Sequence, residues 1–344
     1  MSIEITAAGK PFIHHHSAHC ETGVTTALFR DKGLEISEPM IFGIGSGIFF
    51  GHLPFVKFVG LPITTYRYRA GEIFRKSAKR LGGKFVTQRF RNAQKGMDEL
   101  RRVLKTGQIV GLTTNIYWLS YFPNRYRFQF NGHNIIILHE IENGFRVSDP
   151  VLDNPVDCLT EDLERARFAK GPLQPHGFMY YPKSINLHPD FRTACIKGIK
   201  DACKAMLKIP LPIFGVRGIR YLAERTIKSG EKMGFVEACR QLANIVRMQE
   251  EVGTGGAGFR YMYAAFLEEA AELFGSSELA DLSKEMTAIG DIWREFAVVS
   301  ARIIKQRDQS ENTFAKAGGL MMICAGREEQ LFKDLNIVVR KLKA

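Results

Sequence analysis

The pattern of apolar residues changes near residues 183–190, and this change constrains the fold more than any other feature of the chain. Before it, short apolar or alternating segments between turn residues predict strands among helices. After Pro189, apolar residues recur at helical spacing without strand signals. Because 344 residues also exceed the usual size of one hydrophobic core, we predict two domains. The first is an α+β domain with an antiparallel sheet at 1–185, and the second is an all-α domain at 190–344.

The elements expected in the first part are helices at 22–29, 70–81, 93–105 and 160–169, and strands at 61–68, 108–113, 125–130 and 178–181. In the second part, helical periodicity covers residues 194–207, 236–249, 261–274, 279–304 and 328–342.

The segment Gly132–Pro150 predicts a β-hairpin that carries two polar groups at its open end. Ile135 to Leu138 form an unbroken apolar run, which is typical of a strand buried on both faces. Asn143-Gly144 is a strong signal for a two-residue turn. A hairpin that turns there brings His133, at the start of one strand, close to Asp149, at the end of the other. A histidine held by a carboxylate is half of a nucleophilic site.

Cys20 is the best candidate for the nucleophile. It lies at or near the start of the helix predicted at 22–29, where the helix dipole and backbone N–H groups favour the thiolate form. The alternative is a buried and unreactive cysteine, as we expect for most of the six scattered cysteines of this chain. The hairpin with His133 and Asp149 favours the catalytic interpretation.

The other histidines allow two further interpretations. His139 is a rival base, but it lies about 20 Å along the strand from His133 and at the turn end, remote from Asp149. The run His14 to His16 with Cys20 resembles a metal-binding set. Adjacent histidines on a strand point to opposite faces, so at most two of the three converge, and we predict no metal and no cofactor.

Composition limits the partners. The formal net charge of +12 favours an acidic partner, although a solvated basic surface is the alternative. The basic residues carry no nucleic-acid motif, and no apolar run is long enough to span a membrane. The start of the chain does not resemble a signal peptide, so we expect a cytoplasmic protein that binds neither nucleic acid nor membrane.

Two glycine-rich segments are candidate binding loops. Residues 42–51 contain no phosphate-binding loop, but glycines such as Gly45 and Gly47 allow close backbone approach beside the active site. Gly256 lies in a second glycine loop that precedes Arg260 at the start of a helix, where an anion could bind. The alternative is an interhelical loop with Arg260 in a structural ion pair.

Three segments of the first part resemble the N-terminal domain of butirosin-biosynthesis protein H: His19 to Leu28, Ser37 to Phe50, and Gly132 to Pro150. Gly255 to Leu267 resembles the helical domain that follows it in many such proteins. The family resembles papain-like cysteine enzymes, and the protein that gives it its name transfers an aminoacyl group from a carrier-protein thioester to an aminoglycoside amine.

The resemblance implies Cys20 as nucleophile, His133 as base and Asp149 as the carboxylate that orients the base. Papain-like peptidases usually supply a Gln a few residues before the Cys to stabilise the oxyanion, and this chain has none there. His14, His16 or a backbone N–H near Cys20 would have to serve instead.

We therefore expect a Cys-dependent acyltransferase of secondary-metabolite biosynthesis that uses a carrier-protein thioester and a small amine acceptor. The alternatives are a cysteine peptidase or amidase, and a non-catalytic protein that binds a small ligand on this scaffold. A homodimer is possible, with the helical domain as its surface. The expected substrate contacts are His16, His19, Gly45, Gly47, Asn115, Gly256 and Arg260.

Overall fold

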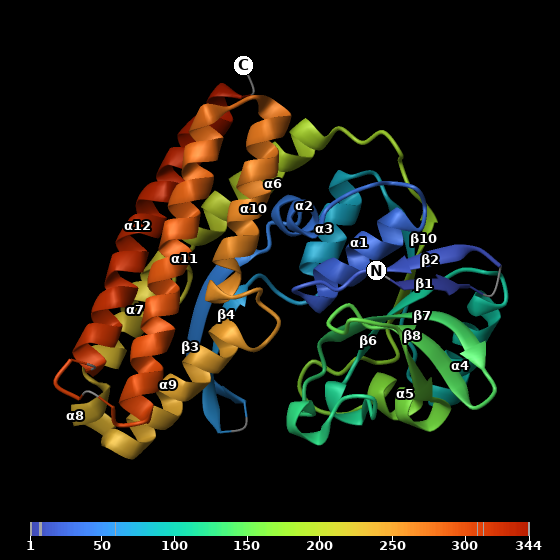
Figure 1. Ribbon diagram of the computed structural model, residues 1–344, viewed down its shortest axis with the longest axis horizontal. Helices are drawn as coiled ribbons and strands as arrows, with labels where there is room; N and C mark the ends of the chain where they lie inside the picture. Colours follow the sequence, from blue (N-terminus) through green and yellow to red (C-terminus); the bar gives the residue numbers. More distant parts are fainter. Residues whose placement is uncertain (1, 7–8, 59, 308, 312, 343–344) are drawn as a thin grey trace. The chain divides into compact units, whose positions relative to one another are not determined.

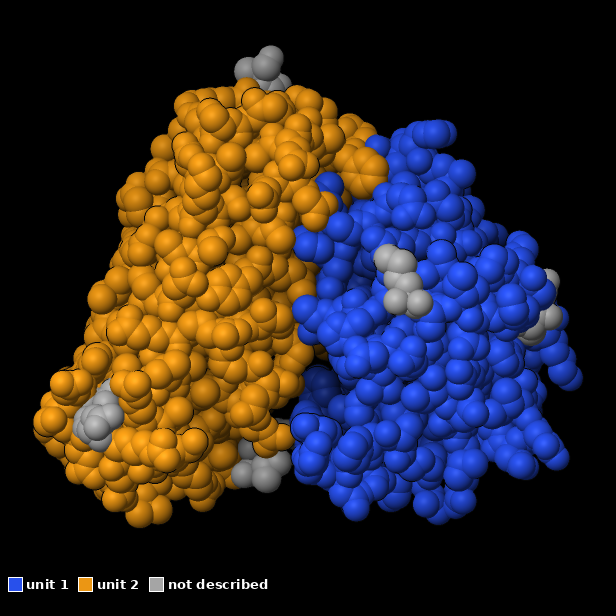
Figure 2. Space-filling model, in the orientation of Figure 1, with its two compact units in different colours: residues 1–41, 77–189 blue, residues 42–76, 190–344 orange. Residues whose placement is uncertain are grey.

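The computed structural model describes residues 2–6, 9–58, 60–307, 309–311 and 313–342, and the chain divides into two compact units. Unit 1 comprises residues 1–41 and 77–189, and unit 2 comprises residues 42–76 and 190–344 (Figure 2). Residues 42–76, which the sequence assigns to the first domain, therefore group with the helical part of the chain.

A six-stranded antiparallel sheet forms the centre of unit 1 (Figure 1). The strands follow the spatial order β5-β10-β6-β7-β8-β9, and a separate two-stranded ribbon pairs β1 with β2. The bounds are β1 (Ser2–Ile5), β2 (Pro11–His14), β5 (Lys84–Gln88), β6 (Val110–Thr114), β7 (His133–Ile141), β8 (Gly144–Ser148), β9 (Val156–Leu159) and β10 (Met179–Ser184).

Helices cover both faces of this sheet. On one face, α4 (Ala93–Leu104) and α5 (Thr160–Arg167) pack against Ile135 and Ile137 of β7 in a shared apolar core. On the other face lies α1 (Cys20–Arg30), which contacts β6, β7 and β10. Burial from both sides explains the unbroken apolar run of β7 and confirms the interpretation of that run.

The hairpin forms, but it turns one residue earlier than the sequence predicts. Ile141 pairs with Gly144, so the turn residues are Glu142 and Asn143. Gly144 belongs to β8, and a Cβ atom built on it would lie 2.1 Å from the backbone oxygen of Cys158 in β9. The glycine is therefore required by the close approach of β9 and not by the turn.

The prediction of a strand at 125–130 is wrong. The structure has a short 3-10 helix, η2 (Asn124–Tyr126), followed by irregular chain. The alternating aromatic residues contact each other locally, as Phe128 and Phe130 do at a ring-centroid distance of 6.0 Å. None of residues 125–130 is buried, so the alternation does not correspond to a buried sheet face.

Unit 2 joins a two-stranded ribbon to a helical assembly. β3 (Ile48–Phe58) pairs with β4 (Leu61–Arg67), and its Phe50 stacks on Trp293 at a centroid distance of 6.2 Å. This apolar contact explains why residues 42–76 belong with the helices. The helices are α6 (Phe191–Leu207), α7 (Gly215–Ile227), α8 (Ser229–Met233), α9 (Phe235–Glu250), α10 (Arg260–Phe274), α11 (Ser277–Ile304) and α12 (Phe314–Lys341). The division between the two units falls within α2 (Glu38–Ile44) and α3 (Glu72–Arg80).

The helices predicted for the second part are present, with α7 and α8 in addition and with α12 starting at Phe314, well before the predicted position. Within the described residues, none of the helices combines the length and the apolar character needed to cross a membrane.

Candidate active site

Cys20 is the first residue of α1, as the sequence predicts. The imidazole of His19 caps this helix by accepting a hydrogen bond from the backbone N–H of Thr22 at 3.4 Å. Cys20 is 8% exposed, so its sulfur is partly shielded from water. A thiol at a helix start is in an environment that favours the thiolate.

Glu38 holds the chain immediately before Cys20. Its carboxylate accepts hydrogen bonds from the backbone N–H groups of Ala18 at 3.0 Å and His19 at 2.9 Å, and from the hydroxyl of Thr22 at 2.6 Å. Burial raises the pKa of Glu38, and these hydrogen bonds oppose that shift. The position of Cys20 is thus fixed by a carboxylate from α2 as well as by its own helix.

A bulge in the β7–β8 ladder decides which residues share a face. The register shifts by one residue at Leu138. Beyond the bulge, Ile136 pairs with Ser148, so continuing the register by one residue places Asp149 opposite Ile135. The side chains of Ile135 and His133 point to the same face of the sheet. Without the shift, Asp149 would lie opposite Ile136 and on the other face of the sheet.

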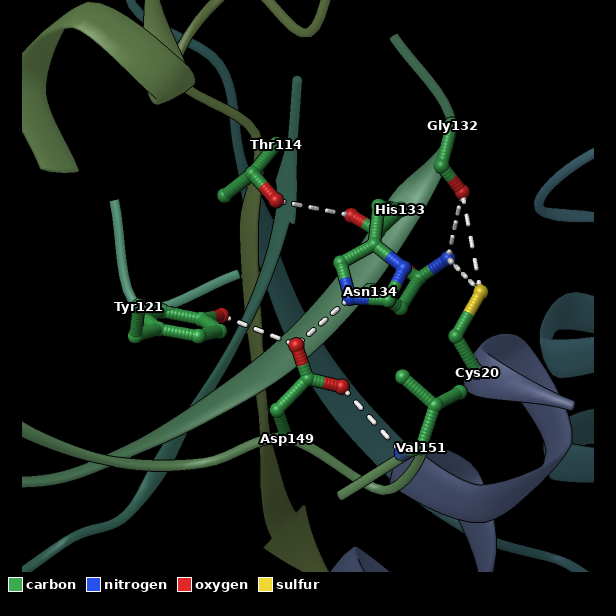
Figure 3. Close-up of polar contacts among 8 residues, drawn as sticks. All are labelled: Cys20, Thr114, Tyr121, Gly132, His133, Asn134, Asp149 and Val151. Atoms are coloured by element: carbon green, nitrogen blue, oxygen red, sulfur yellow. Dashed lines mark hydrogen bonds and ion pairs between the residues drawn. The ribbon is translucent and has the colours of Figure 1, made fainter. Parts of the chain in front are cut away.

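His133 and Asp149 form a buried pair (Figure 3). Nε2 of His133 lies 2.6 Å from Oδ2 of Asp149. The same carboxylate accepts hydrogen bonds from the hydroxyl of Tyr121 at 2.8 Å and from the backbone N–H of Val151 at 3.2 Å. These donors orient the carboxylate and compensate for its burial.

Burial lowers the pKa of His133, but the charge and hydrogen bond of Asp149, together with a smaller contribution from Cys20, outweigh it and raise the pKa to about 10. His133 is therefore protonated at neutral pH. Since Nε2 is bonded to Asp149, Nδ1 is the ring nitrogen available to the thiol. A protonated imidazole beside a thiol favours the thiolate.

Two groups lie against the sulfur of Cys20 (Figure 3). The backbone oxygen of Gly132 and the amide nitrogen Nδ2 of Asn134 are each 3.9 Å from Sγ. Asn134 is not among the site residues that the sequence predicts. Its position directly after His133 was a usable signal. Neighbouring residues on a strand point to opposite faces, so Asn134 points to the face that α1 covers if His133 points to the other.

Two of the predicted substrate contacts of unit 1, His19 and Asn115, have structural roles. His19 caps α1, and Asn115 caps the 3-10 helix η1 (Ile116–Trp118) while its amide donates to Asn131 at 2.7 Å. His16 is exposed and lines a cavity with Gly23 of α1. His14 does not provide an oxyanion donor, because its Nδ1 pairs with Ser148 and its Nε2 with the backbone oxygen of Leu152.

The remaining predicted substrate contacts lie in unit 2. Gly45 and Gly47 are buried, and a Cβ on Gly47 would lie 2.4 Å from the ring of Phe42, so this glycine serves packing. The backbone N–H of Gly256 donates to the hydroxyl of Thr254 at 3.1 Å, and a Cβ on this glycine would lie 2.9 Å from an Arg294 nitrogen.

The expectation that Arg260 binds an anion is wrong. Its side chain is fully buried and makes a two-pronged ion pair with Glu328, at 2.9 and 2.8 Å. It also donates to the backbone oxygen of Gly258 at 2.7 Å, and Glu328 accepts from Trp293 at 2.7 Å. The structural ion pair, which was the alternative interpretation, is what forms.

His139 lies at the turn end of β7, opposite Arg146, and six residues along the strand from His133. Among the residues that the structure describes, no group of three or more His, Cys, Asp or Glu side chains could hold a metal ion.

An antiparallel sheet with a cysteine at the start of the helix on one face, and a His–Asp pair at the strand ends, is the arrangement of a papain-like α+β fold. Residues 19–150 match the family described as "Butirosin biosynthesis protein H, N-terminal", and residues 161–335 match "Domain of unknown function (DUF4872)". The chain belongs to the family of proteins that combine these two domains.

Among solved structures, a C39-like peptidase from Bacillus anthracis is similar, with 18% identity and a TM-score of 0.35. The similarity covers 54% of this chain and 100% of that chain. No curated protein matches the sequence.

Proposed function

We propose that this protein is a cysteine acyltransferase that takes an acyl group from a thioester and passes it to an amine through an acyl-enzyme on Cys20. The observation that carries the proposal is the buried cluster of Cys20 at a helix start with His133, whose pKa Asp149 raises to about 10. Such a cluster supplies a thiolate nucleophile and a proton donor at neutral pH.

The reaction has two balanced halves. The thiolate of Cys20 attacks the thioester carbonyl carbon, the bond from that carbon to the donor sulfur breaks, and the departing thiolate takes the proton of His133. The neutral His133 then takes a proton from the incoming amine as its nitrogen attacks the acyl-Cys20 carbonyl. The bond to Sγ breaks, and the thiolate–imidazolium pair is restored.

Two features favour acyl transfer from a thioester over hydrolysis. Exchange between thioesters is nearly balanced in energy, which suits a thiol nucleophile, and burial of Cys20 and His133 limits access of water to the acyl-enzyme. The net charge of +12 would attract an acidic acyl carrier protein as donor and raise the association rate. The butirosin-biosynthesis likeness makes an amine of a secondary metabolite the proposed acceptor.

The first test compares two cysteines within one molecule. Cys20 and Cys239 are exposed to nearly the same extent, 8% and 9%, but burial raises the pKa of Cys239. Iodoacetamide at neutral pH should label Cys20 much faster than Cys239, as measured by peptide mass spectrometry. Equal labelling would remove the basis of the enzymatic proposal.

The second test separates acyl transfer from peptide hydrolysis. The protein is incubated with an acyl N-acetylcysteamine thioester and then with an acylated carrier protein, and its intact mass is measured. We expect an acyl adduct that is absent in Cys20→Ala, present in Cys239→Ala, and discharged by a small amine. Absence of an adduct together with cleavage of peptide substrates would favour a peptidase or amidase.

A further inference from the structure

Asn134 occupies the position next to the sulfur that an oxyanion-stabilising group needs. Its Nδ2 atom is 3.9 Å from Sγ of Cys20. In a tetrahedral intermediate on Cys20, the negative oxygen is two bonds from Sγ, so a donor beside the sulfur can reach the hydrogen-bond range of about 2.7–3.1 Å. The chain has no Gln before Cys20 to supply this donor, and His14 is already bonded elsewhere.

Its neighbours fix the orientation of the Asn134 amide. The oxygen Oδ1 accepts a hydrogen bond from the hydroxyl of Tyr180 at 3.0 Å and from that of Thr113 at 3.3 Å. On the other side, Nδ2 donates one hydrogen to the backbone oxygen of Gly132 at 3.1 Å. The second hydrogen of Nδ2 is the one that faces Cys20. A flipped amide would set its oxygen against the backbone oxygen of Gly132, which can only accept a hydrogen bond.

Tyr180 is well suited to hold this orientation. It is buried, and its burial, with the nearby charges of Glu21 and Cys20, raises its pKa well above the ordinary value. Its hydroxyl therefore keeps its proton and remains a donor at any pH at which the enzyme would work. The amide is preorganised before substrate arrives, which is the condition for effective oxyanion stabilisation.

The strand geometry also assigns different contacts to His133 and Asn134. Asn134 directly follows His133 on β7, so the two side chains leave the strand on opposite faces. The imidazole reaches Asp149, and the amide reaches the side of the strand that α1 covers. Figure 3 shows the amide nitrogen of Asn134 beside the sulfur of Cys20, and the imidazole of His133 joined to Asp149.

We propose that the side-chain amide of Asn134 is a catalytic residue that donates a hydrogen bond to the oxyanion formed when Cys20 attacks an acyl group. The inference rests on the proposed acyl-enzyme chemistry. As Sγ bonds to the carbonyl carbon, the carbonyl π electrons move to oxygen, which accepts the hydrogen bond from Nδ2. When the electrons return, the bond to the leaving sulfur breaks.

The test uses two reagents that differ in whether an oxyanion forms. Iodoacetamide alkylates Cys20 by displacement and forms no oxyanion, whereas an acyl N-acetylcysteamine thioester does. In Asn134→Leu, which keeps the branched shape of the side chain, acylation should fall about 10²- to 10³-fold while alkylation changes little. Asn115→Leu, at a buried Asn with a structural role, is the matched control and should change the two rates in the same proportion.

Tyr180→Phe provides an independent test if Asn134→Leu does not fold. It removes only the Tyr180 hydroxyl, which helps to orient the Asn134 amide. Acylation should fall relative to alkylation in this variant too, by less than in Asn134→Leu. The inference is overturned if acylation falls no more than alkylation in the folded variants. Failure of the wild-type protein to acylate at all would instead overturn the proposed function.

Discussion

Nε2 of His133 lies 2.6 Å from Oδ2 of Asp149, and both side chains are buried. The two residues are sixteen positions apart and belong to the open end of one hairpin. Their pairing keeps His133 protonated at neutral pH, since its pKa is raised to about 10. The reactivity of Cys20 and the pH dependence of stability should both follow from this contact.

Replacing Asp149 by Asn should disable the site without removing its shape. The variant loses the negative charge that holds the proton on His133, and its amide can stabilise the wrong tautomer of the imidazole. We expect acyl transfer to Cys20 to fall by about 10²- to 10⁴-fold. Stopped-flow acylation with a small thioester gives the rate, and His139→Ala is the control that should keep it.

The His133–Asp149 pair also predicts that the free energy of unfolding depends on pH. The folded-state pKa of His133 is raised from about 6.5 to about 10, so its contribution is fully present below about pH 6.5 and is lost as pH rises through about 10. Asp149→Asn removes this contribution. The difference in unfolding free energy between wild type and variant, from urea titrations, should therefore shrink between these two pH values. A constant difference across the range would contradict the assignment.

The Arg260–Glu328 ion pair should be essential to the stability of unit 2. Because both side chains are fully buried, Glu328→Gln leaves an uncompensated guanidinium and should cost about 3–5 kcal/mol of unfolding free energy. The half-exposed pair of Arg327 with Glu285 is the control, and Glu285→Gln should cost about 0–1 kcal/mol. Comparable losses from chemical denaturation would contradict the distinction.

Two glycines of α12 should respond to alanine with opposite signs. A Cβ on Gly318 would lie 2.4 Å from the Ile227 side chain and 2.7 Å from the backbone oxygen of Ala223 in α7, so Gly318→Ala should destabilise by about 1–3 kcal/mol. Gly326 is exposed with open space around it, and Gly326→Ala should stabilise by about 0.5–1 kcal/mol. Thermal unfolding of both variants decides whether α7 and α12 pack as described.

Local patterns in the sequence determined much of the secondary structure and the candidate residues of the first unit. The helix start at Cys20 and the apolar strand of Ile135 to Leu138 follow from capping and periodicity, which act over short distances along the chain.

Contacts between distant residues were decided by the tertiary structure alone. It placed residues 42–76 with the helices, buried Arg260 against Glu328, and brought Asn134 to the sulfur of Cys20. The bulge at Leu138, which sets Asp149 on the face of His133, is likewise a property of the paired strands. These features depend on which partner satisfies each buried polar or apolar group, and a single sequence does not specify that partner.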